Sequence, residues 1–182
     1  MPTVFSHVAV PMAAAIGLGA RRIPPWALAA GMLAAVAPDF DGIAFKLGIA
    51  YGDMSGHRGF THTLLFALLL GCAGYALAPR WGMRRWTGYL WIALCAASHP
   101  LLDMFTSGGA GIPFLWPVDE GRYFAPWRPI EVSPIALRRF FSPRGAQVML
   151  SELKFVWTPL LCAGLLALSA RRFSAAPRRA AF

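Results

Sequence analysis

Two imidazoles, one guanidinium and two hydroxyls lie within the seven residues His57-Arg58-Gly59-Phe60-Thr61-His62-Thr63. The stretch stands where a polar loop meets a long apolar run. Polar side chains at such a place are costly in lipid unless they have partners. Imidazole nitrogens are common ligands of transition metals, and side chains of the kinds that would complete such a site occur elsewhere in the chain.

The other candidate ligands stand at the ends of separate apolar segments. His99 and Asp103 are four residues apart, and on a helix this spacing puts both on one face, where they can bind one ion. Asp39 and Asp41 are two residues apart, and in an extended turn this puts both carboxylates on one side. The predicted metal ligands are His7, Asp39, Asp41, His57, His62, His99 and Asp103.

The types of these side chains indicate the metal and the chemistry. Imidazole with carboxylate suits Zn²⁺, Mn²⁺ or Fe, and the lack of cysteine ligands argues against a structural zinc site. We expect a divalent metal cofactor, zinc first, with manganese or iron as alternatives. Seven ligands exceed the need of one ion, and a two-metal site would activate water and clamp a phosphoester. Arg58, between two histidines, is the candidate catalytic residue that binds a phosphate oxygen.

Each residue also has a plainer explanation. His7 near a membrane interface is either a ligand or an amphipathic anchor, and Asp39 and Asp41 are either ligands or turn residues. Arg58 alternatively meets lipid phosphate. Thr63 is expected to cap the helix that follows it. The acids interpreted as solvated loop residues are Asp53, Asp119, Glu120, Glu131 and Glu152.

The composition indicates a membrane protein. Of the 182 residues, 57% are hydrophobic and only 14% are charged, whereas a soluble domain carries about 25% charged residues. The formal net charge is +9, but no basic run alternates with aromatics in a polar domain, so we expect no nucleic-acid partner. The first apolar segment has no basic stretch before it, and we expect it to remain in the protein.

The apolar runs predict an all-α fold: a polytopic membrane bundle of about five helices, in a single domain over residues 1–182. An apolar helix of about 20 residues spans the hydrocarbon core. A long irregular insert, 106–154, precedes the last helix, and its prolines interrupt any helix. The stretch 135–157, which begins in the insert and runs into the last helix, has the pattern of an interfacial amphipathic segment. The helices are expected at 4–20, 26–38, 60–78, 86–105 and 155–170, the second being short enough for a partial or tilted span.

Positive charge predicts the orientation of this bundle. With five spans, one side receives arginines and no acid, and short loops rich in Lys and Arg stay in the cytoplasm. The insert is then extracytoplasmic, and all seven candidate ligands face the outer side of the membrane. The arginines assigned to the inside are Arg21, Arg22, Arg80, Arg84, Arg85, Arg171, Arg172, Arg178 and Arg179.

Three motifs carry a resemblance to a known family. The chain resembles the YdjM-like family in three motifs and in His7, which precedes them. The motifs are Pro38-Asp39-Phe40-Asp41, the 57–63 stretch and Ser98-His99-Pro100-Leu101-Leu102-Asp103. That family comprises bacterial inner-membrane-associated, metal-dependent hydrolases, also described as LexA-binding. The resemblance covers about residues 1–130 and implies a multi-pass protein of the bacterial inner (cytoplasmic) membrane. The family is in turn similar to zinc-dependent phospholipases C, which are all-helical, and this analogy of fold implies phosphoester chemistry.

Three functional hypotheses follow. The first is a membrane-bound, metal-dependent hydrolase that meets membrane lipids and cleaves a phosphoester or lipid-linked ester through a one- or two-metal site. The second is a non-catalytic membrane protein whose metal braces the helices and which binds a protein partner. The third, a proton or metal transporter, is disfavoured because its polar residues would be distributed across the membrane depth rather than gathered at one end.

Overall fold

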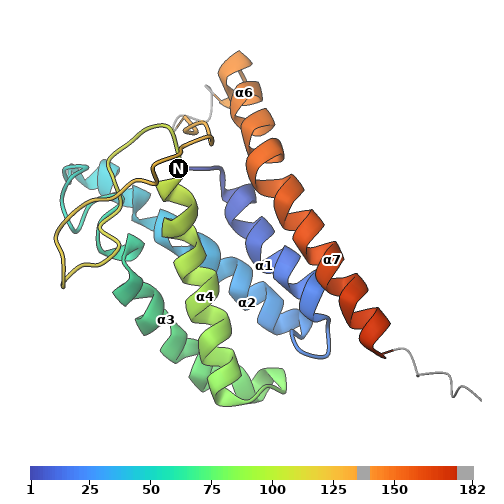
Figure 1. Ribbon diagram of the computed structural model, residues 1–182. Helices are drawn as coiled ribbons and strands as arrows, with labels where there is room; N and C mark the ends of the chain where they lie inside the picture. Colours follow the sequence, from blue (N-terminus) through green and yellow to red (C-terminus); the bar gives the residue numbers. More distant parts are fainter. Residues whose placement is uncertain (135–139, 176–182) are drawn as a thin grey trace, which may run out of the picture.

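The computed structural model describes residues 1–134 and 140–175, and these form an all-helical bundle (Figure 1), which confirms the predicted fold class. Three further elements continue from the main helices or stand between them: η1 (Ala37–Leu47), η2 (Phe60–His62) and η3 (Ala78–Trp81). Among the described residues, extended pairing is limited to two isolated bridges. The main helices are α1 (Val4–Leu18), α2 (Pro25–Val36), α3 (Leu64–Leu77), α4 (Arg85–Met104), α6 (Pro143–Glu152) and α7 (Thr158–Ala175).

Small residues allow the helices to pack closely. The tightest pair is α3 with α4, where a Cβ atom on Gly74 would overlap the carbonyl oxygen of Gly88. Membrane helices use such contacts because lipid provides no hydrophobic force between them. Large apolar side chains point outward instead, with Leu33, Leu94 and Leu166 at 58%, 67% and 71% exposure. This distribution suits a bundle surrounded by lipid.

Three helical segments of the described chain are long and apolar enough to cross a membrane: Pro25–Leu47, Leu64–Trp81 and Pro143–Ser174. The second predicted segment is therefore longer than expected, because α2 continues into η1. Helix α1 is apolar but shorter. Helix α4 has 20 residues, but it carries His99 and Asp103 and is less apolar than the three segments named above.

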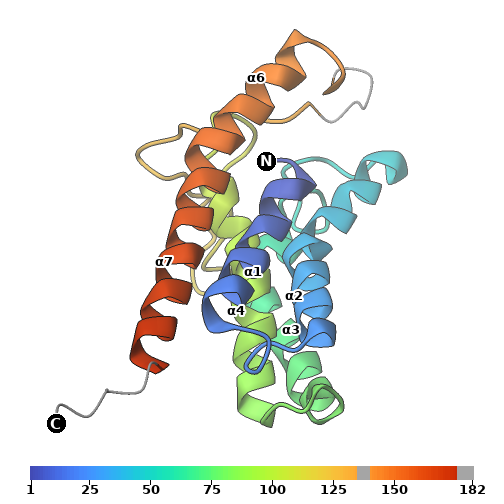
Figure 2. The same cartoon turned by 90° about the vertical axis from the view of Figure 1, so that its right-hand side faces the viewer.

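The two ends of the bundle differ in their chemistry. Figure 2 shows the N-terminus, η1 and α6 at one end, and the α1–α2 loop, the α3–α4 loop and the last turns of α7 at the other. The second end carries the arginine-rich loops, including Arg21, Arg22 and Arg80. Arg178 and Arg179 lie outside the described residues, as do Arg138 and Arg139 of the predicted interfacial segment. Which end faces the cytoplasm stays a prediction.

The last helix begins earlier than the sequence indicated. It starts at Pro143, not near residue 155, because proline is tolerated in a first helical turn. The five-residue π-helix η4 (Leu153–Trp157) joins α6 to α7 in one long helix. The predicted boundary at residue 155 was therefore wrong.

Glu152 is buried, which contradicts its interpretation as a solvated loop residue. Its side chain is 0% exposed. Its carboxylate accepts hydrogen bonds from the Thr3 backbone N–H and hydroxyl, at 2.5 Å each, and from the Ser6 hydroxyl at 2.6 Å. The Trp157 indole also donates to Ser6. These bonds fasten the long helix to the start of α1.

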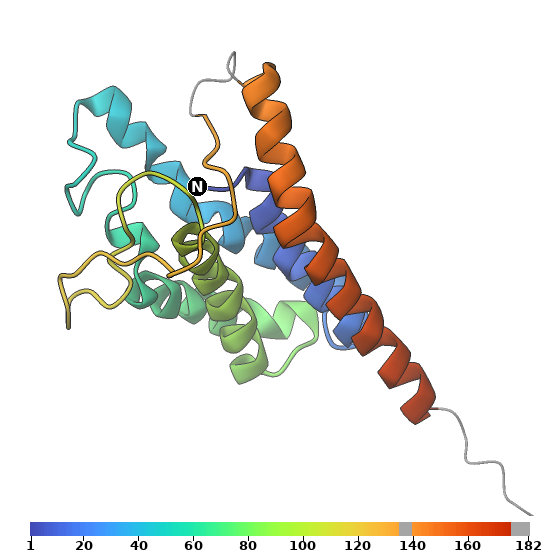
Figure 3. The ribbon, with the colours of Figure 1, turned by 45° about the horizontal axis from the view of Figure 1, so that its top comes forward.

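Residues 106–134 contain no helix and cross the end of α4, as Figure 3 shows from that end. Backbone N–H groups of Ala125 and Ile130 donate to carbonyls of Met104 and Phe105, the last residues of α4 and its cap. The Arg122 side chain donates to the carbonyls of Arg58, Gly111 and Gly52. The segment thereby covers the end of the bundle where the candidate ligands lie.

Candidate metal centre

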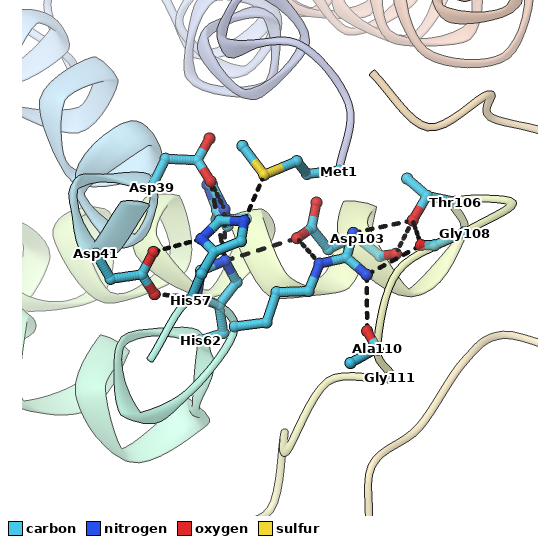
Figure 4. Close-up of polar contacts among 12 residues, drawn as sticks. Met1, Asp39, Asp41, His57, His62, Asp103, Thr106, Gly108, Ala110 and Gly111 are labelled. Carbon is cyan, nitrogen blue, oxygen red and sulfur yellow. Dashed lines mark hydrogen bonds and ion pairs between the residues drawn. The ribbon is translucent and has the colours of Figure 1, made fainter. Parts of the chain in front are cut away.

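All seven predicted ligands meet in one buried cluster at the end of the bundle near the N-terminus. The four histidines and Asp103 are at most 3% exposed, and the side chains of Asp39 and Asp41 are 8% and 7% exposed. Figure 4 shows Asp39, Asp41, His57, His62 and Asp103 pointing toward one another. The ligands come from α1 (His7), η1 (Asp39, Asp41), the following loop (His57), η2 (His62) and α4 (His99, Asp103).

The loop before α3 folds tightly to bring its histidines inward. Arg58 has a positive φ of 62°. The neighbouring Gly59 lies so close to the Met54 carbonyl oxygen that a Cβ atom would overlap it. After this turn, the Thr63 hydroxyl accepts a hydrogen bond from Phe66 N at 3.0 Å, which confirms the predicted cap of α3.

The ligand atoms form two adjacent groups of three. In each group, one atom from each residue lies within 4.8 Å of the others. The groups adjoin, because His99 Nε2 lies 3.2 Å from His62 Nε2 and 3.3 Å from Asp39 Oδ1. Three protein ligands with an open position is the usual arrangement of a catalytic zinc site. The groups are His7, His99 and Asp103, and Asp39, His57 and His62.

Asp41 belongs to neither group and lies behind two of the imidazoles. Its Oδ1 is 2.6 Å from His57 Nδ1, and its Oδ2 is 3.2 Å from His62 Nδ1. A carboxylate in this position fixes the tautomer and leaves Nε2 free for a metal. The Nδ1 atom of His99 is held in the same way by the Ala35 carbonyl oxygen, at 2.7 Å.

The expected extended turn at Asp39 and Asp41 was wrong. These residues lie in the 3₁₀ helix η1, in which about three residues make a turn. Residues two apart therefore point to different sides, and Asp39 faces His99 while Asp41 faces the outer nitrogens of His57 and His62. Direct ligation by Asp41 stays a prediction.

Unsatisfied buried atoms indicate that the cluster fits divalent cations. Both ring nitrogens of His7 and both oxygens of Asp39 and Asp103 are buried and have no hydrogen-bond partner within the described part of the chain. Such groups cost about 1–3 kcal/mol each, and more when charged. With neutral imidazoles, three carboxylates and Arg58 leave a net charge of −2, which one divalent cation neutralises.

The state of His62 agrees with ligation. Burial lowers the pKa of its imidazole below the ordinary value, although Asp41 acts in the opposite direction. The lowered pKa favours the neutral form of the ring, which is the form that binds a metal ion. His57 Nε2 lies 2.8 Å from the Met1 sulfur, so this flexible side chain has to move when His57 binds an ion.

Arg58 is fully buried, and its guanidinium contacts the loop after α4. Its Nη1 donates to the carbonyls of Gly108 and Ala110, its Nη2 donates to the Thr106 hydroxyl, and its Nε lies 3.3 Å from Asp103 Oδ2. This placement holds Asp103 and the loop together. Anion binding by Arg58 stays a prediction. Thr106, three residues after Asp103, was not singled out from the sequence, although its hydroxyl also donates to the Asp103 carbonyl.

Comparison with known proteins agrees with the membrane character of the helical bundle. The chain is 46% identical over 170 residues to the inner membrane protein YbcI of Escherichia coli strain K12, covering 91% of this chain and 97% of that protein. No solved structure matches the chain significantly. A family model described as YdjM inner membrane protein matches residues 1–176. With its helical bundle and its apolar exterior, the chain belongs to the YdjM family of inner membrane proteins.

Proposed function

We propose that this protein is a membrane-bound, metal-dependent hydrolase that acts on a phosphoester or lipid-linked ester. The observation that carries the proposal is the convergence of two three-ligand groups, in which the ring nitrogens of His7 and the oxygens of Asp39 and Asp103 have no hydrogen-bond partner among the described residues. Buried carboxylates whose oxygens accept no hydrogen bond from the described residues, as in Asp39 and Asp103, are suited to cations.

The residues have distinct parts in this proposal. His7, His99 and Asp103 hold one ion, and Asp39, His57 and His62 hold a second. Asp41 and the Ala35 carbonyl orient the imidazoles from behind. Divalent ions held there supply Lewis acidity toward a phosphoryl or carbonyl oxygen and a lowered pKa for water.

The reaction is a simple hydrolysis. The oxygen of one water bonds to phosphorus or to the acyl carbon, and the bond from that atom to the alcohol oxygen breaks. One proton of the water ends on the leaving alcohol, and the other is released to solvent when the acid product ionises. Of the cluster residues, Asp39 and His57 line a cavity from which a substrate would reach the site.

Metal content tests the proposal first. We expect stoichiometric zinc, manganese or iron in the detergent-purified protein by elemental analysis, and its loss in His62→Ala and Asp103→Ala. Asp53→Ala removes an exposed carboxylate and is the matched control that should retain the metal. Phosphoesterase activity should disappear in the two site variants. Retained activity in either, or no metal after reconstitution with each ion, contradicts the proposal.

Deep burial also supports a second candidate, a structural metal site in a protein that binds a partner. His7, His62, His99 and Asp103 are 0% exposed, and structural sites are closed. This alternative predicts that metal removal lowers stability while no phosphoester or lipid ester is cleaved by the metal-loaded protein.

A further inference from the structure

A cavity of about 430 Å³ opens beside the metal centre. Its volume lies in the range of about 300–1,000 Å³ that small-molecule sites occupy. Asp39 and His57 of the ligand cluster line it together with the polar residues Thr3 and Ser133, and Phe5, Phe45 and Phe140 contribute three aromatic rings to its wall. A molecule in this cavity therefore meets the candidate ligands and three aromatic rings at once.

The candidate ligands and the apolar wall of the cavity are in direct contact. The Phe45 ring lies 5.2 Å from the His57 imidazole, between centroids, and 5.8 Å from the Tyr51 ring. His57 in turn is fixed by Asp41 at its Nδ1 atom. The Phe45 ring of the apolar wall is thus in direct contact with the candidate ligand His57.

Exposed apolar side chains also lie on η1 and α1, the two elements that contribute Phe45 and Phe5 to the cavity. On η1, Phe40, Ile43 and Leu47 are 64%, 61% and 68% exposed, and Phe5 on α1 is 57% exposed. Exposed apolar groups of this kind mark contact with a membrane or a partner. Because η1 continues a segment apolar enough to span a membrane, we assign these side chains to lipid.

We infer that the cavity receives the hydrocarbon chain of a membrane lipid phosphate ester, with the lipid head group at Asp39 and His57. This inference rests on the proposed hydrolase function and identifies its substrate class. Two divalent ions would change the charge of the cluster from −2 to +2, which suits a phosphate group of about −1.5 to −2. Phenylalanine rings are suited to an alkyl chain, whose burial is favourable for each methylene group.

The cavity can be filled without altering a ligand. Gly42 lines it, and a Cβ atom on Gly42 would meet no other atom within 4 Å, so we expect Gly42→Trp to fold and keep its metal. Gly52→Trp is the matched control, because Gly52 also has open space but does not line the cavity. The probe is phosphatidic acid with a photoreactive diazirine in one acyl chain, added to protein reconstituted in phospholipid vesicles.

We expect light-induced labelling of Phe5, Phe45 or Phe140, mapped by peptide mass spectrometry. In Gly42→Trp this labelling should fall about tenfold, the loss that corresponds to about two methylene groups displaced from the cavity. Gly52→Trp should be labelled like the wild type. Equal labelling of all three proteins, or labels confined to the outer faces of the helices, overturns the inference.

A second measurement separates this inference from the proposed function. The rates of hydrolysis of phosphatidic acid and of water-soluble p-nitrophenyl phosphate are compared in the wild type and in Gly42→Trp. A variant impaired only toward the lipid supports the inference. Equal loss or retention of both activities overturns it and leaves a hydrolase. Specific labelling of the cavity without cleavage of either ester supports lipid binding there and contradicts the hydrolase.

Discussion

At the end of the bundle where the N-terminus lies, the buried carboxylate of Glu152 can be compared with those of Asp39 and Asp103. The oxygens of these carboxylates have different surroundings. Glu152 accepts three hydrogen bonds from Thr3 and Ser6, whereas the oxygens of Asp39 and Asp103 have none from the described residues. Glu152 and Asp103 are both 0% exposed. Burial alone therefore does not mark a candidate metal ligand, and it is the oxygens without hydrogen bonds that set Asp39 and Asp103 apart from Glu152.

Among the tests of this difference between Glu152 and the two aspartates, metal removal should have the largest effect on stability. Without cations, the buried carboxylates of Asp39 and Asp103 accept no hydrogen bond from the described residues and are compensated only in part by neighbours such as His99 and Arg58, so we expect chelation to lower the melting temperature by about 10 °C or more. Circular dichroism of the detergent-purified protein, before and after chelation and again after metal is restored, checks this. A melting temperature that stays constant after complete metal loss would contradict the assigned role of the unsatisfied oxygens.

Glu152→Ala should affect stability and leave the metal centre intact. The substitution removes the acceptor of three donors at the start of α1, and we expect a loss of about 3 kcal/mol in the free energy of unfolding. Denaturation and elemental analysis of the same preparations measure both properties. Glu120→Ala removes an exposed acid and should change neither. Metal loss in Glu152→Ala would show that the two carboxylate groups are not independent.

Arg58→Lys tests a buried charged side chain that, unlike Asp39 and Asp103, makes most of the hydrogen bonds open to it. Lysine keeps the charge but cannot reach the carbonyls of Gly108 and Ala110 with a planar fork, so we expect a loss of about 2 kcal/mol. Hydrogen exchange should become faster at residues 106–112. Arg80→Lys, in the exposed far loop, is the control. Reduced turnover with unchanged exchange would instead support the anion-binding role predicted from the sequence.

Asp41→Asn should give the smallest effect, on metal affinity. If Asp41 orients His57 and His62 without binding metal, we expect a 10- to 100-fold weaker affinity. Titration of the metal-free protein with Zn²⁺ measures this. Asp39→Asn removes a proposed ligand and should weaken binding further. Equal losses in both variants would make Asp41 a ligand, as the sequence analysis predicted.

Several features followed from local sequence alone. The apolar runs predicted an all-helical membrane protein, and the four-residue spacing of His99 and Asp103 predicted a shared helix face; both lie in the group with His7. Thr63 before an apolar run predicted the cap of α3. These inferences succeeded because helix periodicity and capping depend on residues within one or two turns of each other.

Other features depend on contacts between residues far apart in the chain. Glu152 is buried because Thr3 and Ser6, almost 150 residues away, donate to it, and no local pattern reports this pairing. Arg58 points to carbonyls about 50 residues later, and Asp41 faces imidazole nitrogens contributed by the 57–62 stretch. The sequence determined which side chains are available near the metal centre. The packing of α1, η1, η2 and α4 determined which atoms face a cation, because backbone carbonyls and distant hydroxyls compete for the same groups.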